Sequence, residues 1–152
     1  MEINRIYDDT LQQVIPLFDA YRVFYGQPSD LRRSGRFLRA RVGSGESVLF
    51  AAVLENGQAP AGFTHLYPIY SSVRTVKNWL LNDLFVDQAF RRRGIGEALI
   101  RRAMDFAHTE GASVIRLETA VTNVTAQRLY ERLGFRKKAP DAAFFTYENA
   151  LR

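Results

Sequence analysis

Apolar positions along the chain change between strand-like and helix-like spacing. Apolar runs of strand length occupy residues 2–7, 47–54, 61–70, 76–86 and 114–119. Between them, apolar residues recur every three or four positions over residues 11–25, 31–42, 95–108 and 123–133, which is the period of an amphipathic helix. Aromatic residues between 135 and 147 predict one or two last strands. The pattern therefore predicts an α/β (α+β) protein with six to seven strands and about four helices.

Several residues mark where these elements should turn, bend or pair. The Asn56-Gly57 pair is typical of a tight hairpin between two antiparallel strands. Pro16 fits poorly inside the first helix and predicts that it forms two pieces, and Pro68 predicts an interruption of the strand that contains it. The order strand, helix, strand over residues 76–119 predicts a parallel pair, added to an otherwise mostly antiparallel sheet.

Caps are expected at two helix starts. Ser29 or Asp30 is the predicted cap of the helix over residues 31–42, and Thr122 or Asn123 caps the last helix. We see no repeat and no linker, so residues 1–152 are expected to form a single domain.

Composition narrows the classes of function. The chain has no cysteine, which excludes disulfides, thiolate metal sites and cysteine nucleophiles, and a cytoplasmic location is expected. No metal site is predicted. No segment approaches the roughly 20 apolar residues of a membrane span, and no basic and apolar leader is present, so a soluble, unprocessed protein is expected. The net charge of +5 comes mainly from arginine and favours phosphorylated or acidic ligands.

The most basic segment is the helix over residues 31–42. It carries five arginines, Arg32, Arg33, Arg36, Arg39 and Arg41. They form either a solvated helix face or an anion-binding surface. Nucleic-acid binding is not expected, because the segment lacks interleaved aromatics and matches no known motif.

The stretch from Asn82 to Ala98 carries the clearest chemical signal. An apolar run ends in a loop with three arginines, and Gly94-Ile95-Gly96 then opens a helix. Unpaired amides at a helix start and the helix dipole bind anions, and glycines let a ligand approach the main chain. A Walker loop is absent. A dinucleotide fingerprint is disfavoured, because Leu99 stands where its third glycine should be.

Two motifs together resemble the GNAT (Gcn5-related) N-acetyltransferase superfamily. The pattern R-x-x-G-x-G begins at Arg91 and resembles the family's acetyl-coenzyme A (acetyl-CoA) signature. The later segment N-x-x-A-x-x-L-Y-x-x-L-G-F, from Asn123 to Phe135, matches a second family segment at the expected distance. The stretch L-N-D-L-F-V-D resembles the branch of small histone, polyamine and amino-acid acetyltransferases.

The resemblance implies a GNAT fold and an acetyl-CoA site. The implied cofactor-binding residues are Leu84, Phe85, Val86, Arg91, Arg92, Arg93, Gly94, Ile95, Gly96, Glu97, Ala98, Asn123, Ala126 and Tyr130. Within this set Arg91 is the first choice for a side-chain contact to phosphate, while Arg92 and Arg93 supply mainly backbone amides.

The implied reaction is direct attack of a primary amine, from a small molecule or a lysine, on the acetyl thioester. Tyr130 holds the family position of the acid that protonates the leaving thiolate, and main-chain amides near Phe85 and Val86 can polarise the carbonyl. Many relatives place a glutamate base where this chain has Asn82. Asp83 is the first alternative, although strand alternation leaves its direction open, and His65 is the second.

Four tyrosines, Tyr21, Tyr25, Tyr67 and Tyr70, lie in segments that flank the acceptor site of the resembling fold. With five arginines nearby in the sequence, we expect spermidine-type polyamines to be poor substrates and an acceptor with its own carboxylate or phosphate to be better. A second interpretation is a GNAT module that binds acetyl-CoA as a sensor without transfer. The resemblance also implies a homodimer.

Overall fold

The computed structural model describes residues 1–55 and 59–151 in two compact units, Met1–Glu118 and Thr119–Arg152. Each unit is described by itself. The hairpin predicted at Asn56-Gly57 lies outside the described residues.

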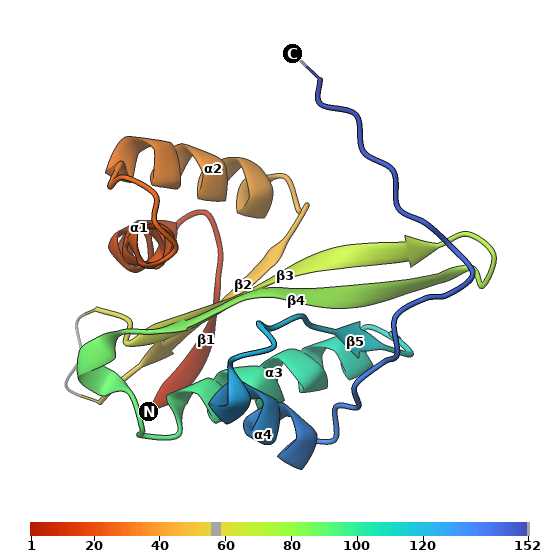
Figure 1. The fold of residues 1–152 in the computed structure, drawn as a ribbon. Coiled ribbons are helices and arrows are strands. Elements are labelled where there is room, and N and C mark those ends of the chain that lie inside the picture. The colour runs from red at the N-terminus through yellow and green to blue at the C-terminus, as the bar shows by residue number, and fades with distance from the viewer. Residues whose placement is uncertain (56–58, 152) are drawn as a thin grey trace. The chain divides into compact units, whose positions relative to one another are not determined.

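The first unit is built on a five-stranded sheet in the order β1-β2-β3-β4-β5. The strands are β1 (Glu2–Ile6), β2 (Val48–Val53), β3 (Gly62–Ser71), β4 (Val76–Val86) and β5 (Ile115–Arg116). The first four are antiparallel neighbours, and β5 runs parallel to β4, with Trp79 opposite Ile115. Figure 1 shows β3 and β4 as the long central pair. The predicted meander and parallel pair are confirmed.

The prediction of six to seven strands is wrong for the described residues, which form five. The strands expected after Phe135 are missing, and Phe144, Phe145 and Tyr147 are 78%, 88% and 88% exposed. A strand needs a neighbouring strand to bond its backbone groups. Among the described residues of the second unit the regular element is a helix, α4 (Val124–Arg132), so this aromatic segment has no strand of its own unit to pair with.

Pro68 does not interrupt β3, contrary to the sequence prediction. The strand continues to Ser71, and Pro68 lies opposite Trp79 of β4. The last residue of β3 that pairs with β2 is Leu66, opposite Val48. Pro68 therefore lies where one edge of β3 is open, and a strand tolerates a missing N–H there.

Two helices cover one face of the sheet. The predicted break at Pro16 is confirmed, because a 3₁₀ helix, η1 (Leu11–Gln13), precedes α1 (Ile15–Phe24) and Pro16 sits in the first turn of α1. The second helix, α2 (Leu31–Gly43), is capped by Asp30, whose carboxylate accepts from the Arg33 amide. Phe18 of α1 packs against Phe63 of β3 within the core.

Asp19 connects α1 to the start of α2 through hydrogen bonds. Its buried carboxylate accepts hydrogen bonds from Ser29 Oγ (2.6 Å), the Asp30 amide (2.9 Å) and Ser34 Oγ (2.8 Å). Burial alone would raise the pKa of Asp19, but these hydrogen bonds and the charge of Arg22 lower it below its ordinary value. The ionised carboxylate therefore fixes the loop between the two helices.

The helix α3 (Ile95–Thr109) packs on the opposite face of the same sheet, as Figure 1 shows. Phe106 of α3 lies with its ring centroid 5.1 Å from Trp79 of β4 and 5.5 Å from Phe50 of β2. A short 3₁₀ helix, η2 (Gln88–Phe90), lies between β4 and α3. The sheet of the first unit is thus a middle layer, with α1 and α2 on one face and α3 on the other.

A β-bulge at Asn82 interrupts the pairing of β3 with β4. His65 lies opposite Asp83, whereas Leu66 lies opposite Leu81, so Asn82 is an extra residue in β4. Side chains alternate along a strand, so one extra residue reverses the faces that follow it.

The ring contacts on β4 show this reversal. Before the bulge, Trp79 packs on Phe106 of α3. After it, Phe85 packs on Tyr21 of α1, with 5.8 Å between ring centroids. Asp83, two positions before Phe85, consequently faces α1.

Candidate active site

The bulge places a buried carboxylate among hydrogen-bond donors. Asp83 is 5% exposed, and its Oδ1 accepts from the Tyr21 hydroxyl (2.7 Å) and from Asn82 Nδ2 (2.9 Å). Its Oδ2 lies 3.3 Å from His65 Nδ1. Three of the predicted site residues are therefore brought together around Asp83.

His65 links Asp83 to a residue that sequence analysis missed. The imidazole is 0% exposed, and Nε2 lies 2.6 Å from Ser47 Oγ. Ser47 precedes β2, so only the pairing of β2 with β3 brings it to His65. A single serine before an apolar run gives no signal of such a contact. Tyr67 also adjoins the ring, with its hydroxyl 3.5 Å from Nδ1.

The two tyrosines beside Asp83 keep their protons to unusually high pH. Burial, then the hydrogen bond to Asp83 and its negative charge, raise the pKa of Tyr21 well above its ordinary value. Burial and then the charge of Asp83 raise the pKa of Tyr67 to about 12. Both phenols therefore stay protonated at neutral pH, and Tyr21 donates its proton in the hydrogen bond to Asp83 Oδ1.

The other two predicted tyrosines differ in position. The Tyr25 ring centroid is 5.0 Å from that of Tyr21, and Tyr25 is 66% exposed at the end of α1, at the rim of the cluster. Tyr70 lies five residues beyond His65 on β3 and pairs with Lys77 of β4. Tyr70 is thus not part of the group around Asp83.

The turn between β4 and α3 exposes main-chain groups. Asp87 accepts from the Ala89 amide (2.8 Å) and shapes η2. Arg92 and Gly94 both have positive φ, 63° and 75°, which turns the chain sharply before α3. The Ala98 amide makes a helical bond to Gly94 C=O, so the amides just before it lie at the open start of the helix. Such a turn can bind phosphate.

Arg91 folds back onto the strand that precedes it. Its Nε donates to the Val86 carbonyl (3.1 Å), and its guanidinium lies 5.4 Å from the Phe24 ring centroid and 5.7 Å from that of Phe85. The Arg93 guanidinium lies 5.5 Å from the Phe90 ring centroid. Arg91 therefore stabilises the turn itself, and the predicted contact of its side chain with phosphate stays a prediction.

Gly62 is a second residue that sequence analysis missed. It lies opposite Val86, and a Cβ at this position would stand 2.9 Å from the Phe85 carbonyl oxygen and 3.1 Å from Ile95 Cγ2. Only glycine allows β3, the end of β4 and the start of α3 to approach so closely. Its signal would have been a lone glycine inside a strand pattern.

The second unit holds the later motif on α4. Asn123 caps this helix, because its side chain accepts from the Ala126 amide (3.3 Å). Tyr130 is half-buried in the last part of the helix, and its ring lies 6.0 Å from that of Phe135. The predicted cap and helix are confirmed.

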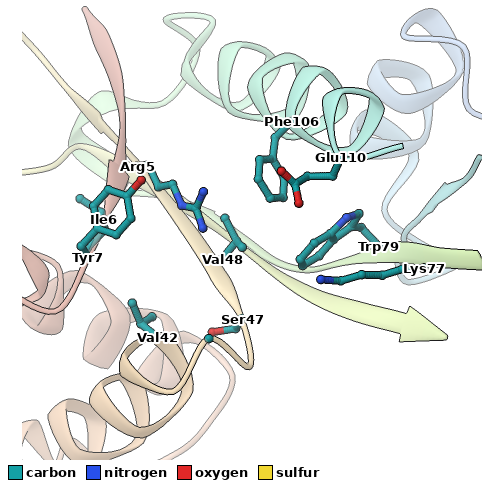
Figure 2. A pocket seen from close by; sticks show the side chains of 11 residues that line it. Arg5, Ile6, Tyr7, Val42, Ser47, Val48, Lys77, Trp79, Phe106 and Glu110 are labelled. Carbon is teal, nitrogen blue, oxygen red and sulfur yellow. The ribbon is translucent and has the colours of Figure 1, made fainter. Parts of the chain in front are cut away.

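A cavity of about 120 Å³ lies at the edge of the first unit. Figure 2 shows Ser47 and Val42 at one end and Phe106, Glu110 and Trp79 at the other. Of the residues around His65 and Asp83, Ser47 alone lines it. Within residues 1–55 and 59–151, no group of His, Asp and Glu could hold a metal ion, and no helix is long and apolar enough to cross a membrane.

Comparisons with known proteins agree with this geometry. The model of the acetyltransferase (GNAT) family matches residues 11–135. An uncharacterised N-acetyltransferase of Bacillus subtilis, YhfO, is 40% identical over 97% of this chain and 95% of its own length. A probable acetyltransferase of Haemophilus influenzae is 34% identical over 95% of this chain and 96% of its own.

Solved structures agree as well. The crystal structure of a probable acetyltransferase has a TM-score of 0.88 and 34% identity, over 100% of this chain and 99% of that one. An aminoglycoside acetyltransferase bound to sisomicin has a TM-score of 0.77 at 22% identity, a likeness in fold over 97% of this chain and 96% of that one. The chain therefore belongs to the acetyltransferase (GNAT) family and is an acyl-CoA-dependent N-acetyltransferase.

Proposed function

We propose that this enzyme transfers the acetyl group of acetyl-CoA to a primary amine of a small molecule or a lysine side chain, by direct attack of the amine. The main observation behind the proposal is the path of the backbone along β4. Its bulge turns Asp83 toward α1, and the strand ends three residues later, at Val86, where the turn leading to α3 begins. One strand thus presents a proton acceptor and a phosphate-binding turn.

The turn fits the polyanionic coenzyme. The amides from Arg91 to Glu97 would hold its pyrophosphate, helped by the helix dipole. A Cβ on Gly94 would meet nothing within 4 Å, and one on Gly96 would meet only Val86 Cγ2 at 4.0 Å, so the main chain here is open to a ligand. Leu84, Phe85 and Val86 would lie along the thioester.

Proton transfer is assigned to two residues. Asp83 takes the proton of the attacking ammonium at Oδ1, directly or through Tyr21 or a water, and His65 supports it from the Oδ2 side. Tyr130 gives a proton to the leaving thiolate, an assignment supported by its place in the family motif. Asn82, which cannot accept a proton, orients the Asp83 carboxylate instead.

The acceptor is proposed to carry a carboxylate or phosphate of its own. Arg32, Arg33 and Arg36 are exposed on α2, and α2 packs against α1, the helix that carries Tyr21. A polycation such as spermidine would be repelled by these guanidinium groups.

The remaining features are extensions of the same proposal. Residues 1–152 act as one domain, because the family match over 11–135 spans both units. The protein is a cytoplasmic homodimer, with the exposed aromatic residues Phe144, Phe145 and Tyr147 as a contact. Light scattering at two protein concentrations measures the oligomeric state, and a monomer at both would refute the dimer.

The test measures thiol release from acetyl-CoA with spermidine, a lysine peptide and a panel of amino acids. Transfer should be fastest with an acidic amino acid, and Asp83→Asn should lose at least ten-fold in kcat/KM while binding coenzyme A as before, since the base contributes roughly 100-fold or more. A clear preference for spermidine would refute the acceptor class. Tight calorimetric binding of acetyl-CoA without transfer to any amine would refute the enzyme and identify a sensor.

A further inference from the structure

His65 joins Asp83 to a side chain that the acetyl transfer described above does not use. Nδ1 lies 3.3 Å from Asp83 Oδ2, and Nε2 lies 2.6 Å from Ser47 Oγ. Both ring nitrogens therefore have a side-chain partner. His65 is 0% and Ser47 4% exposed, so bulk water does not compete for either contact.

The partners determine which nitrogen carries the proton. An ionised carboxylate only accepts hydrogen bonds, so the nitrogen that faces Asp83 must be Nδ1–H. Nε2 then offers a lone pair, and the Ser47 hydroxyl donates to it. Tyr67 Oη, 3.5 Å from Nδ1, is a distant second partner that can accept from the same N–H.

We propose that Ser47 is a positioning residue for acetyl transfer: its hydroxyl donates to Nε2 and so holds the His65 ring with Nδ1–H directed at Asp83. The inference rests on the proposed function, in which Asp83 accepts the proton of the amine. His65 lies behind the carboxylate at Oδ2, whereas Tyr21 and Asn82 contact Oδ1. The imidazole thus stabilises the ionised base without occupying the oxygen that exchanges the proton.

Removing the hydroxyl leaves Nε2 as a buried acceptor without a side-chain donor, which costs free energy. Asp83 still keeps the proton on Nδ1, but the ring is then held from one side only and can turn so that Nδ1–H leaves Asp83 Oδ2. The carboxylate would lose the donor that fixes it from its Oδ2 side.

Other charged and titratable groups lie around the pair. They are Tyr21 and Tyr25 on α1, Arg41 on α2, Glu46 just before β2, and Tyr67 on β3. Arg41 and Glu46 form an ion pair with Nε 2.6 Å from Oε2, although its angle is not that of a hydrogen bond. Ser47 also lines the cavity in Figure 2, so a threonine methyl has space beside it.

The first experiment needs no turnover. The chain has two histidines, His65 and His108, so ¹⁵N-histidine NMR resolves the His65 tautomer once His108→Gln, on the exposed side of α3, assigns the signals. We expect the same Nδ1–H signal in the natural protein and in Ser47→Thr, and a shifted or broadened Nδ1–H signal in Ser47→Ala, because the ring is less well held. An Nε2–H ring in the natural protein, or no change in Ser47→Ala, would overturn the proposal.

The second experiment measures kcat for the amine and the KM for acetyl-CoA. Ser47→Ala should lower kcat about five-fold, with the KM for acetyl-CoA unchanged. Ser47→Thr should restore kcat. His65→Asn, whose amide can replace Nδ1–H, should retain more activity than His65→Gln, which reaches toward Ser47 instead.

A loss of kcat in Ser47→Ala with an unchanged His65 signal and a lowered temperature of thermal unfolding would show a structural role and overturn the proposal. If the natural protein acetylates no amine, the proposed function fails together with the catalytic part of this inference. The NMR result would then show separately whether Ser47 orients His65.

Discussion

Replacing Gly62 by alanine should destabilise the enzyme and disturb the end of β4. The added Cβ would stand 2.9 Å from the Phe85 carbonyl oxygen, 3.1 Å from Ile95 Cγ2 and 3.2 Å from Val86 Cγ2. The first of these is a backbone atom in the middle of a sheet and cannot move aside by a change of rotamer. The strands must separate, or β4 must shift relative to α3.

The size of the effect follows from two opposing terms. Overpacking a well-packed site costs about 1–3 kcal/mol. Replacing a glycine in a strand interior raises the free energy of unfolding by roughly 0.5–1 kcal/mol, because the unfolded chain then has fewer backbone conformations. The net loss is on the order of 1–2 kcal/mol, which lowers the Tm of a chain of this size by about 5 °C.

Urea denaturation and acetyl-CoA binding together check the result. Affinity should fall with stability, because Phe85 and Val86 are proposed to lie along the thioester. Gly43→Ala is the matched control: its Cβ would meet only Asp8, at 3.6 Å from Oδ1, so stability should stay the same or rise slightly. A Gly62→Ala protein as stable as Gly43→Ala, with full affinity, would refute the close-approach argument.

Three further results are expected. Gly94→Ala, with φ at 75°, should cost roughly 1 kcal/mol and weaken coenzyme A binding by calorimetry; unchanged binding would exclude this turn as the pyrophosphate site. The lowered pKa of Asp19 means that its contribution to stability is present above about pH 4 and lost as pH falls further, so Asp19→Asn should flatten the dependence of unfolding free energy on pH below about pH 4. The raised pKa of Tyr67 means that stability is lost as pH rises from about 10 toward about 12, and Tyr67→Phe should weaken that loss; an identical alkaline profile would contradict it.

The order of elements could be predicted because each segment carries its own periodicity. The break at Pro16 and the cap at Asn123 are local effects, and both are confirmed. The errors concern neighbours in space. Pro68 is tolerated because β2 ends its pairing at Leu66, and the aromatic segment around Phe144 lacks a partner strand in its unit. Neither fact can be predicted from the residues that neighbour Pro68 or Phe144 in the sequence.

For the site as well, local features could be predicted from the sequence and contacts between distant residues could not. Glycines and arginines marked the turn before α3, and the stretch around Asp83 marked the strand. Ser47 and Gly62 were not found, because each matters only through a residue distant in sequence, His65 and Phe85 respectively. The direction of Asp83 also could not be predicted, since it depends on pairing register.

The bulge at Asn82 depends on an extra residue in β4 and not on the side chain of that residue. Its side chain is exposed, so many substitutions would leave the sheet intact. In a strand of this length, pairing without the bulge would put Asp83 on the Trp79 face, beneath α3. Deleting Asn82 would instead leave Leu81 and Asp83 adjacent, opposite Leu66 and His65 as now, so Asp83 would still face α1. The deletion should therefore keep the register of the sheet and remove the amide that donates to Asp83 Oδ1.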